Sequence, residues 1–451
     1  MCNKQCLRSQ LIKFFILFLL FDSYYSLGQN SSNKLKGSIL DRNDSSGLEF
    51  AHVYLKNSTI GTYTNTNGEF LFYYPDSLAQ DTLVVSRIGY TSYNLALGER
   101  DTTTTDLSIY LSESKDYLDE VVVYAKKDTV VSIVKKAIKR FRKNYPTRLH
   151  YLEGFYRELS LKGDEYTRLI EASVGITENS YRKAETKTKI KVRQIRKSED
   201  YRDYSIKAKL YLAAMKLAMG ESFADYNNLS KMLKMNFAKI DRGKITIWFE
   251  ELNFIEAFDF EIAKVTVENG HKRMHISFQM PLTASAVSYS AGELVINMED
   301  YAIIEWKYGQ IPHPSKAIKK LDVMYYKGRF HRHNHIIYSK IEDKYYPTFF
   351  EMYEPILKGE KHVYEDGRKE YQFDKITFMV NQVITRKRDF DRIKNREALE
   401  EDLDLYDTDH SYDPEFWANY NLLLLDPLLK PAKEDLEKEK SLETQFEDNG
   451  E

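Results

Sequence analysis

Short runs of residues that alternate between apolar and polar, closed by turn-forming residues, constrain the fold of this chain more than any other feature. Five such runs, residues 36–40, 51–56, 69–74, 82–86 and 107–111, follow one another with Asn, Asp, Gly and Ser between them. An apolar side chain at every second position is the pattern of a strand with one buried face. The runs therefore predict a small β-sandwich over residues 33–113.

The turns of this region and its spaced motifs resemble a known domain. Asn65-Thr66-Asn67-Gly68 predicts a tight turn, and Gly89 predicts a position that a Cβ would strain. The motifs are Gly37-x-Ile39, Ala51-x-Val53-x-Leu55, Gly61-Thr62 through Phe70, Ile88-Gly89-Tyr90 and Leu118-Asp119-Glu120-Val121-Val122-Val123. In this order they resemble the carboxypeptidase regulatory-like domain, as found at the N-terminus of TonB-dependent transporters.

That resemblance implies a transthyretin-like, seven-stranded sandwich that serves as a structural or interaction module and has no catalytic residues of its own. A transporter would continue with a plug and a large barrel. The residues after 113 are too few for a plug and a barrel together. We therefore expect that the chain carries this domain but is not a transmembrane transporter.

The first 28 residues predict a secretory signal peptide. Its positive residues are Lys4, Arg8 and Lys13, and its apolar run covers residues 14–21. The run is much shorter than the roughly 20 apolar residues of a membrane-spanning helix, which is the alternative interpretation. Small residues at Ser26 and Gly28 predict cleavage before Gln29.

Both cysteines, Cys2 and Cys6, lie in this predicted signal peptide. Disulfides, thiol catalysis and zinc–thiolate sites are therefore not expected after cleavage. We expect an exported protein in the periplasm or at the periphery of the outer membrane.

The chain after the sandwich predicts a linker over residues 114–127, a large domain over 128–390 and an acidic, partly helical tail over 391–451. Residues 119–123 could add a strand to a sheet edge. From Asp128 to Pro146, apolar residues occupy one helical face and Lys and Arg the other, which predicts an amphipathic helix. We expect it to pack on the core; an anionic membrane surface is the alternative.

The large domain predicts an antiparallel sheet. Strands are expected at residues 151–159, 166–176, 245–254, 273–279, 293–298, 302–308, 322–327, 335–341, 345–353 and 371–380. Residues 206–219 and 226–237 have the composition of a helical insertion. The predicted fold class is mainly β: a small sandwich plus a larger, half-barrel-like domain with a packed helix. At the level of fold, this is similar to periplasmic carriers of lipoproteins and lipids.

Three histidines at every second position, His331, His333 and His335, are the metal-ligand candidates. On a strand they share one face, with about 6.6 Å between neighbours and about 13 Å between the ends. At most two of them can therefore bind one metal ion, and another strand would have to supply a third ligand. Because no sequence feature identifies that ligand, we predict a polar surface and no metal site.

Other catalytic patterns are weak. His150 and Glu153, and His362 and Glu365, match the short His-x-x-Glu pattern of carboxypeptidases but lack its sequence context. His271 and His275 are four residues apart without a catalytic Glu between them. We therefore predict no catalytic residues, no cofactor and no nucleic-acid partner.

Charge is distributed unevenly along the chain. Residues 126–216 contain 24 Lys and Arg against 11 Asp and Glu, whereas residues 396–451 contain 5 against 18. The basic region is expected to dock the acidic tail or to be solvated, with anionic lipid headgroups as the alternative. Aromatic and Leu residues between 412 and 425 predict an apolar anchor for the tail.

The sequence thus predicts an exported, non-enzymatic envelope protein that binds another envelope protein or an outer-membrane component. The first alternative is a periplasmic carrier or sensor that holds a lipid or a peptide in the large domain, which requires an apolar cavity. The second is a metallohydrolase, which requires a pair of histidines that meets an acidic residue.

Overall fold

The computed structural model describes residues 32–99, 106–116, 127–162, 165–179, 181, 188–202, 227–234, 236, 244–247, 250–281, 288–312, 333–355, 362–363, 369–370, 372–409, 412–424 and 430–450. The predicted signal peptide, residues 119–123, the first part of the helical insertion and the predicted strand at 322–327 lie outside the described residues.

The first domain is a sandwich of two sheets, as predicted. One sheet has the order β4-β1-β7 and the other β3-β2-β5-β6. The strands are β1 (Ser32–Asp41), β2 (His52–Leu55), β3 (Gly61–Tyr63), β4 (Glu69–Pro75), β5 (Thr82–Ser86), β6 (Tyr93–Ala96) and β7 (Asp106–Leu111). The apolar residues of their inner faces, among them Ile39, Phe70 and Val85, form a separate core. The short strands β3 and β6 were not predicted.

The predicted turn at Asn65 is confirmed and has a clear physical basis. The Asn65 side chain accepts hydrogen bonds from the backbone N–H groups of Asn67 and Glu69, at 3.1 and 2.8 Å. Gly68 has a φ of 78°, and a Cβ there would lie 2.2 Å from the Ile39 carbonyl oxygen. Only glycine satisfies both requirements.

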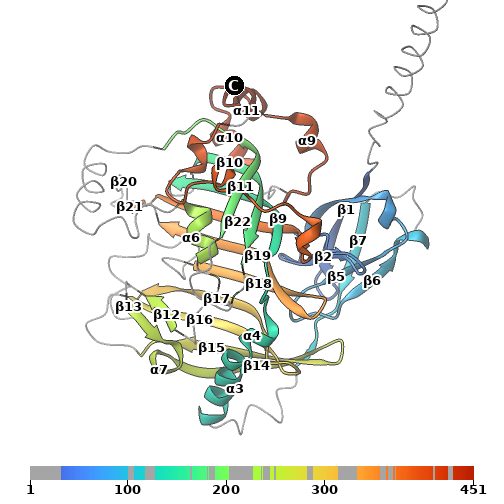
Figure 1. The fold of residues 1–451 in the computed structure, drawn as a ribbon, viewed down its shortest axis with the longest axis vertical. Coiled ribbons are helices and arrows are strands. Elements are labelled where there is room, and N and C mark those ends of the chain that lie inside the picture. Colours follow the sequence, from blue (N-terminus) through green and yellow to red (C-terminus); the bar gives the residue numbers. More distant parts are fainter. Residues whose placement is uncertain are drawn as a thin grey trace, which may run out of the picture.

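The large domain is one antiparallel sheet of 11 strands in the order β11-β10-β9-β22-β19-β18-β17-β16-β15-β14-β8 (Figure 1). Its strands are β8 (Lys115–Asp116), β9 (His150–Lys162), β10 (Glu165–Glu178), β11 (Lys189–Lys197), β14 (Asp259–Glu268), β15 (His271–Gln279), β16 (Ser288–Asn297), β17 (Ile303–Pro312), β18 (His333–Ile341), β19 (Lys344–Pro355) and β22 (Gln372–Ile384). The mainly β fold class is confirmed.

Three details differ from the sequence prediction. Residues 245–254 form a hairpin, β12 (Lys244–Ile247) and β13 (Glu250–Asn253), and not one strand. Strands β11 and β14 were not predicted. The amphipathic helix is divided into α3 (Lys127–Lys139) and α4 (Phe141–Asn144), because Arg140 leaves the helical conformation with φ −90° and ψ 0°.

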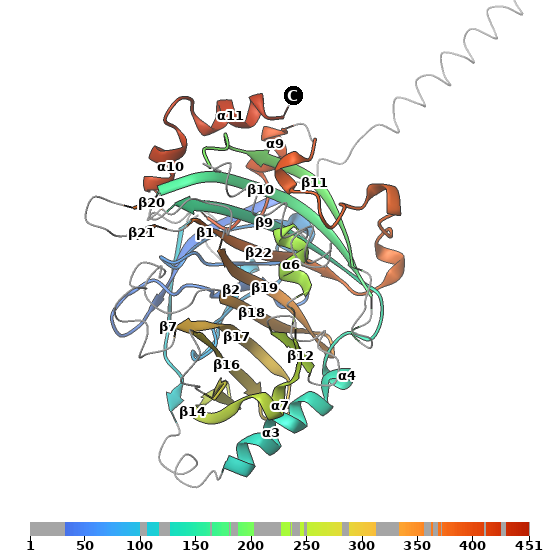
Figure 2. The ribbon, with the colours of Figure 1, turned by 90° about the vertical axis from the view of Figure 1, so that its left-hand side faces the viewer.

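The two faces of the large sheet have different neighbours (Figures 1 and 2). One face, here called the helix face, packs on α3, α4, α6 (Asn228–Lys234) and α7 (Phe254–Ala257). Its core includes Val134, Tyr156, Ile276 and Phe350. The opposite face packs on the first domain and on α9 (Pro414–Ala418), through Tyr63, Phe155, Phe349 and Trp417.

The tail covers one end of the sheet. Helices α10 (Lys430–Leu436) and α11 (Leu442–Asp448) lie against β10 and β11 at the top of Figure 1. Trp417, Tyr420 and Leu423 are buried, so the predicted apolar anchor is confirmed. No helix among the described residues is long and apolar enough to cross a membrane.

Candidate functional site

The junction between the two domains is buried and specific. The Tyr63 hydroxyl, on β3, lies 2.7 Å from Thr348 Oγ1, on β19. The backbone N–H of Tyr63 lies 3.2 Å from the Met379 sulfur, and His52 Nδ1 lies 3.2 Å from Ser339 Oγ. Tyr63, Phe349 and Met379 are at most 1% exposed. The β3 edge of the sandwich is thus used for contact with the large sheet.

Two of the three predicted histidines meet an acidic residue beside this junction. In the antiparallel register, His335 lies directly opposite Glu351, and His333 lies two residues away on the same face. Possible ligand atoms of His333, His335 and Glu351 all lie within 4.8 Å of one another. These three residues are called the histidine cluster below. His331 lies outside the described residues.

Charged residues from the neighbouring strands surround the cluster. Glu305 Oε1, on β17, lies 2.7 Å from His335 Nε2 and 3.2 Å from Lys307 Nζ. Burial raises the pKa of Glu305, but Lys307 and the hydrogen bond from His335 outweigh it and hold this pKa well below its usual range. Burial lowers the pKa of His333 to about 4. A neutral imidazole is the form that binds a metal ion.

On the other side of the cluster, Lys375 of β22 lies 3.4 Å from Glu351 Oε2. Burial lowers the pKa of Lys375, but the carboxylates of Glu351 and of Glu49, which belongs to the first domain, outweigh it and raise this pKa well above its usual value. Lys375 therefore stays charged and neutralises part of the negative charge at the junction.

The first domain covers the cluster with a strained residue. The Phe50 ring lies edge-on to the His335 ring at 5.2 Å and packs on Phe349 at 4.8 Å. Phe50 has a φ of 59°, a left-handed conformation that costs a bulky residue of the order of 1–3 kcal/mol. The surrounding contacts hold the ring in place despite this cost.

Sequence reasoning found His333 and His335 but missed Glu351. The missing signal was the hairpin register. The turn pairs Ile341 with Lys344, and a bulge opposite Ile337 and Tyr338 then shifts the pairing by one residue and places His335 opposite Glu351. Glu351 lies on the neighbouring strand β19, the kind of position from which the sequence analysis required a third ligand to come.

Among the described residues, the other candidate pairs from the sequence do not come together as a site. His150 and Glu153 lie on opposite faces of β9, and His150 Nε2 instead lies 3.6 Å from Glu178. The side chains of His362 and Glu365 lie outside the described residues. His271 and His275 lie on strand β15, where positions four apart are separated by about 13 Å.

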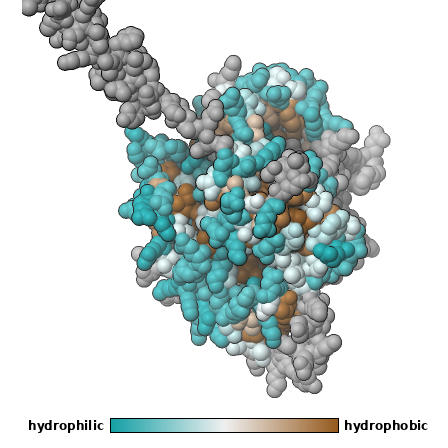
Figure 3. Space-filling view, turned by 90° about the vertical axis from the view of Figure 1, so that its right-hand side faces the viewer, coloured by the Kyte–Doolittle hydropathy of each residue, from teal (hydrophilic) through white to brown (hydrophobic). Residues whose placement is uncertain are grey.

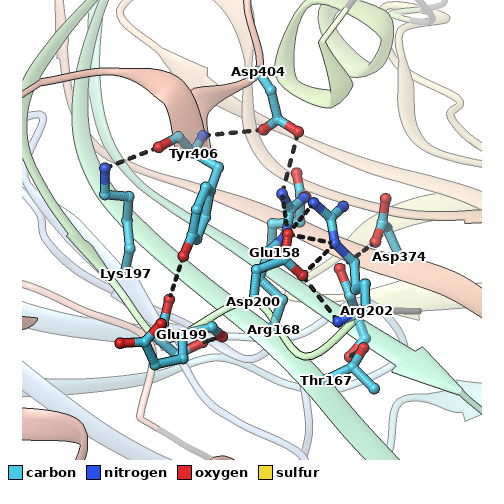
Figure 4. A network of polar contacts seen from close by, with 12 residues as sticks. Glu158, Thr167, Arg168, Lys197, Glu199, Asp200, Arg202, Asp374, Asp404 and Tyr406 are labelled. Atoms are coloured by element: carbon cyan, nitrogen blue, oxygen red, sulfur yellow. Dashed lines mark hydrogen bonds and ion pairs between the residues drawn. The ribbon is translucent and has the colours of Figure 1, made fainter. Parts of the chain in front are cut away.

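A second polar group is buried on the helix face (Figure 4). Arg168, which is 1% exposed, forms ion pairs with Glu158 and with Asp404, the latter at 3.1 Å. Tyr156 donates a hydrogen bond to Glu158 at 2.6 Å, and Asn228 donates to Glu158 at 3.1 Å. We call Glu158, Arg168 and Asp404 the buried charge network.

The network gives its carboxylates opposite shifts. Burial raises the pKa of Glu158, because Arg168 offsets only part of the lost hydration. For Asp404, burial alone would raise the pKa, but the attraction of the Arg168 guanidinium is stronger, and the net result is a lowered pKa. With these partners the network holds together β9, β10, α6 and the start of the tail, which indicates a structural role.

The basic region docks the acidic tail, as one of the predicted alternatives stated. Lys191 pairs with Glu397 at 3.3 Å, and the Lys197 ammonium donates to the carbonyl oxygens of Tyr406 and Thr408 at 2.8 and 3.1 Å. The Arg196 guanidinium lies 4.5 Å from the Trp417 ring centroid. These contacts cover β11, the edge strand of the large sheet.

The described surface includes at least two open hollows. One, of about 250 Å³, lies between the first domain, β22 and the α9 segment, and its lining includes Tyr73, Asn381 and Asn421. The other, of about 350 Å³, is formed by Tyr301 and side chains of α3, among them Lys136. Neither is the enclosed apolar cavity that a carrier requires. On the helix face, Phe254, Phe278 and Trp306 pack ring against ring instead.

Comparison with known proteins defines the first domain. It forms a sandwich of a three-stranded and a four-stranded sheet with the tight turn at Asn65. Residues 35–123 match the CarboxypepD_reg-like domain family, so the chain carries a CarboxypepD_reg-like domain and the predicted resemblance is confirmed. The comparison with curated proteins found no match.

Solved structures show only remote similarity. A putative outer membrane lipoprotein-sorting protein domain from Vibrio parahaemolyticus is 7% identical over 59% of this chain and 97% of its own, with a TM-score of 0.23. A LolA superfamily protein from Nitrosomonas europaea is 10% identical over 61% and 99%, with a TM-score of 0.23. A putative membrane-associated protein of unknown function from Bacteroides fragilis is 7% identical over 78% and 99%, with a TM-score of 0.15. These TM-scores are too low to establish a shared fold.

Proposed function

We propose that the protein is an exported component of the cell envelope that acts as an adaptor, binding another envelope protein through its CarboxypepD_reg-like domain and catalysing no reaction of its own. The predicted signal peptide supports the exported location. The adaptor role is supported mainly by the distribution of free strand edges.

Within the described residues, the sandwich uses one side for the junction and leaves other strand edges unpaired. Ile60, next to β3, forms a bridge to Gln382 of β22. In the described sheets, β6 pairs only with β5, and β7 pairs only with β1. Tyr93 on β6 and Tyr110 on β7 are 39% and 40% exposed, and they are the large apolar side chains that stand exposed in the described part of the chain.

An open strand edge with an exposed tyrosine suits recognition of an extended segment. The unpaired backbone groups of the edge form hydrogen bonds with an added strand, and pockets or side chains beside it give specificity. Tyrosine is enriched in interfaces because its ring buries a large area while its hydroxyl stays polar. The face that carries the first domain is mostly hydrophilic, with apolar residues only in small patches (Figure 3). This surface favours edge recognition over a broad apolar contact.

Site-specific photo-crosslinking in the native envelope tests this proposal. A photoreactive phenylalanine is placed at Tyr93, at Tyr110 and, as the matched control, at Lys264, an exposed residue of β14 in the large sheet. We expect a discrete protein adduct from position 93 or 110 and none from 264. Equal labelling from all three positions, or no adduct from either tyrosine position, would contradict the adaptor role.

A further inference from the structure

The histidine cluster has the donor set of a metal site. Two imidazoles and one carboxylate are the protein ligands of several three-ligand zinc sites, and imidazole nitrogens also suit other divalent ions of the first transition row. His335 and Glu351 are 3% and 7% exposed, so the donors are largely removed from water. Buried donors of this kind require partners, and a metal ion can be one of them.

The surroundings fit a bound ion. Glu305 accepts a hydrogen bond from one ring nitrogen of His335, at 2.7 Å, and so fixes the orientation of the ring. A carboxylate in this position is a regular feature of metal sites, where it holds the ligating histidine. Glu351 uses Oε2 for its ion pair with Lys375, which leaves its second oxygen for an ion.

The geometry needs only a small adjustment. In a tetrahedral site with metal–ligand distances of about 2.1 Å, the ligand atoms lie about 3.4 Å apart. The ligand atoms of the cluster lie within 4.8 Å of one another, so a rotation of the side chains of His333 and Glu351 is sufficient. The backbone of the β18–β19 hairpin already places them on one face.

We propose that His333, His335 and Glu351 bind one divalent transition-metal ion, with Zn²⁺ as the best match, and that this ion fastens the CarboxypepD_reg-like domain to the large sheet. The link to the first domain is Phe50, whose ring packs on His335. Fixing the His335 ring therefore fixes the surface on which Phe50 and β3 rest. The proposal is independent of the adaptor role, since it concerns the junction and not the free edges.

The competing explanation is a metal-free group of ion pairs, in which Lys307 and Lys375 neutralise Glu305 and Glu351. The two explanations differ in their response to added metal. Ion binding requires the histidine nitrogens, whereas the ion pairs of the two lysines do not.

The direct test is zinc binding by the purified, tag-free mature protein after treatment with a chelator. We expect one Zn²⁺ per chain, measured by elemental analysis after dialysis and by competition with a zinc indicator. H333Q and E351Q should lose this stoichiometric binding, and E305Q should weaken it about 10–100-fold, as loss of a supporting carboxylate does in other metal sites. H271Q is the matched control, because His271 also contacts a glutamate but is exposed, and it should bind like the wild type.

A second measurement tests the fastening. Hydrogen exchange at β3, whose Tyr63 N–H contacts the Met379 sulfur, should slow when zinc is added to the wild type but not to H333Q. Circular dichroism of each variant confirms that it is folded. A wild-type protein that binds neither Zn²⁺ nor, under anaerobic conditions, Fe²⁺ in stoichiometric amount would overturn the proposal. So would unchanged binding in H333Q.

Discussion

Removing the Arg168 guanidinium from the buried charge network should destabilise the protein far more than removing an exposed arginine. Arg168 is 1% exposed and pairs with Glu158, whose side chain is 3% exposed. Replacing Arg168 by Met keeps much of the volume but leaves the Glu158 carboxylate buried without its cation. Loss of one partner of a buried ion pair costs about 3–5 kcal/mol.

The expected loss for R168M lies near the lower limit, about 3 kcal/mol, for two reasons. The hydrogen bonds from Tyr156 and Asn228 still reach Glu158 at 2.6 and 3.1 Å. Burial also raises the pKa of Glu158, so the carboxyl can take up a proton once Arg168 is gone. The double variant R168M/E158Q should therefore recover part of the loss, because it removes the unpaired charge.

Urea unfolding followed by far-UV circular dichroism measures these differences. The matched control is R193M: Arg193 also pairs with a glutamate, Glu153, at 2.9 Å, but its side chain is 42% exposed. Exposed ion pairs contribute at most about 1 kcal/mol. If R168M loses no more stability than R193M, or if adding E158Q deepens the loss, the reasoning from burial is refuted.

Three further predictions concern other contacts. Y63F and T348V should each lower the free energy of unfolding by about 1 kcal/mol, since each removes the same buried hydrogen bond; a double-mutant cycle with fully additive losses would contradict this. Burial lowers the pKa of His52 from 6.5 to about 3. Between pH 6.5 and pH 3, His52 therefore binds a proton in the unfolded chain but not in the folded chain, and the free energy of unfolding should fall as the pH decreases through this range. H52Q should flatten that fall in denaturant titrations, and equal pH profiles would count against it. G154A should lower the free energy of unfolding by about 1–3 kcal/mol, because the added Cβ would lie 2.4 Å from the Met379 carbonyl oxygen. An unchanged melting temperature would contradict this, since it would mean that the neighbouring strand moves aside at little cost.

Two strands of the large sheet that the sequence analysis did not predict, β11 and β14, both depart from the period of two at a bulge. In β14, a register shift between Ile262 and Lys264 moves the buried positions from Phe260 and Ile262 to Val265, so the alternation breaks in mid-strand. In β11, the register shifts where Gln194 pairs with Ser173 and Val192 pairs with Val174. The buried residues Val192 and Ile195 are therefore three positions apart, and not two or four. Bulges also occur in β10 and β19, which were predicted, so a bulge weakens the alternation without always hiding the strand.

The candidate site was predictable in part. Two histidines on one strand face could be found from their spacing, but Glu351 depends on the hairpin register, and the cover by Phe50 depends on how the sandwich docks. A loop residue before β2 gives no sequence signal that it packs on a residue almost three hundred positions later.

Local features could be predicted from the amino-acid sequence: the sandwich with its Asn65 turn, the family of the first domain, the helix after Asp128 and most strands of the large sheet. These follow from periodicity and turn chemistry, which act between near neighbours. Which charged residues are buried could be learned only from the folded chain. Glu158, Arg168 and Asp404 look like ordinary surface residues in the sequence, and the order of strands in the sheet brings them together under α6 and the tail. Burial is a property of the assembled layers, and for that reason the buried charge network, and the place of Glu351 beside the two histidines, became visible only in the folded chain.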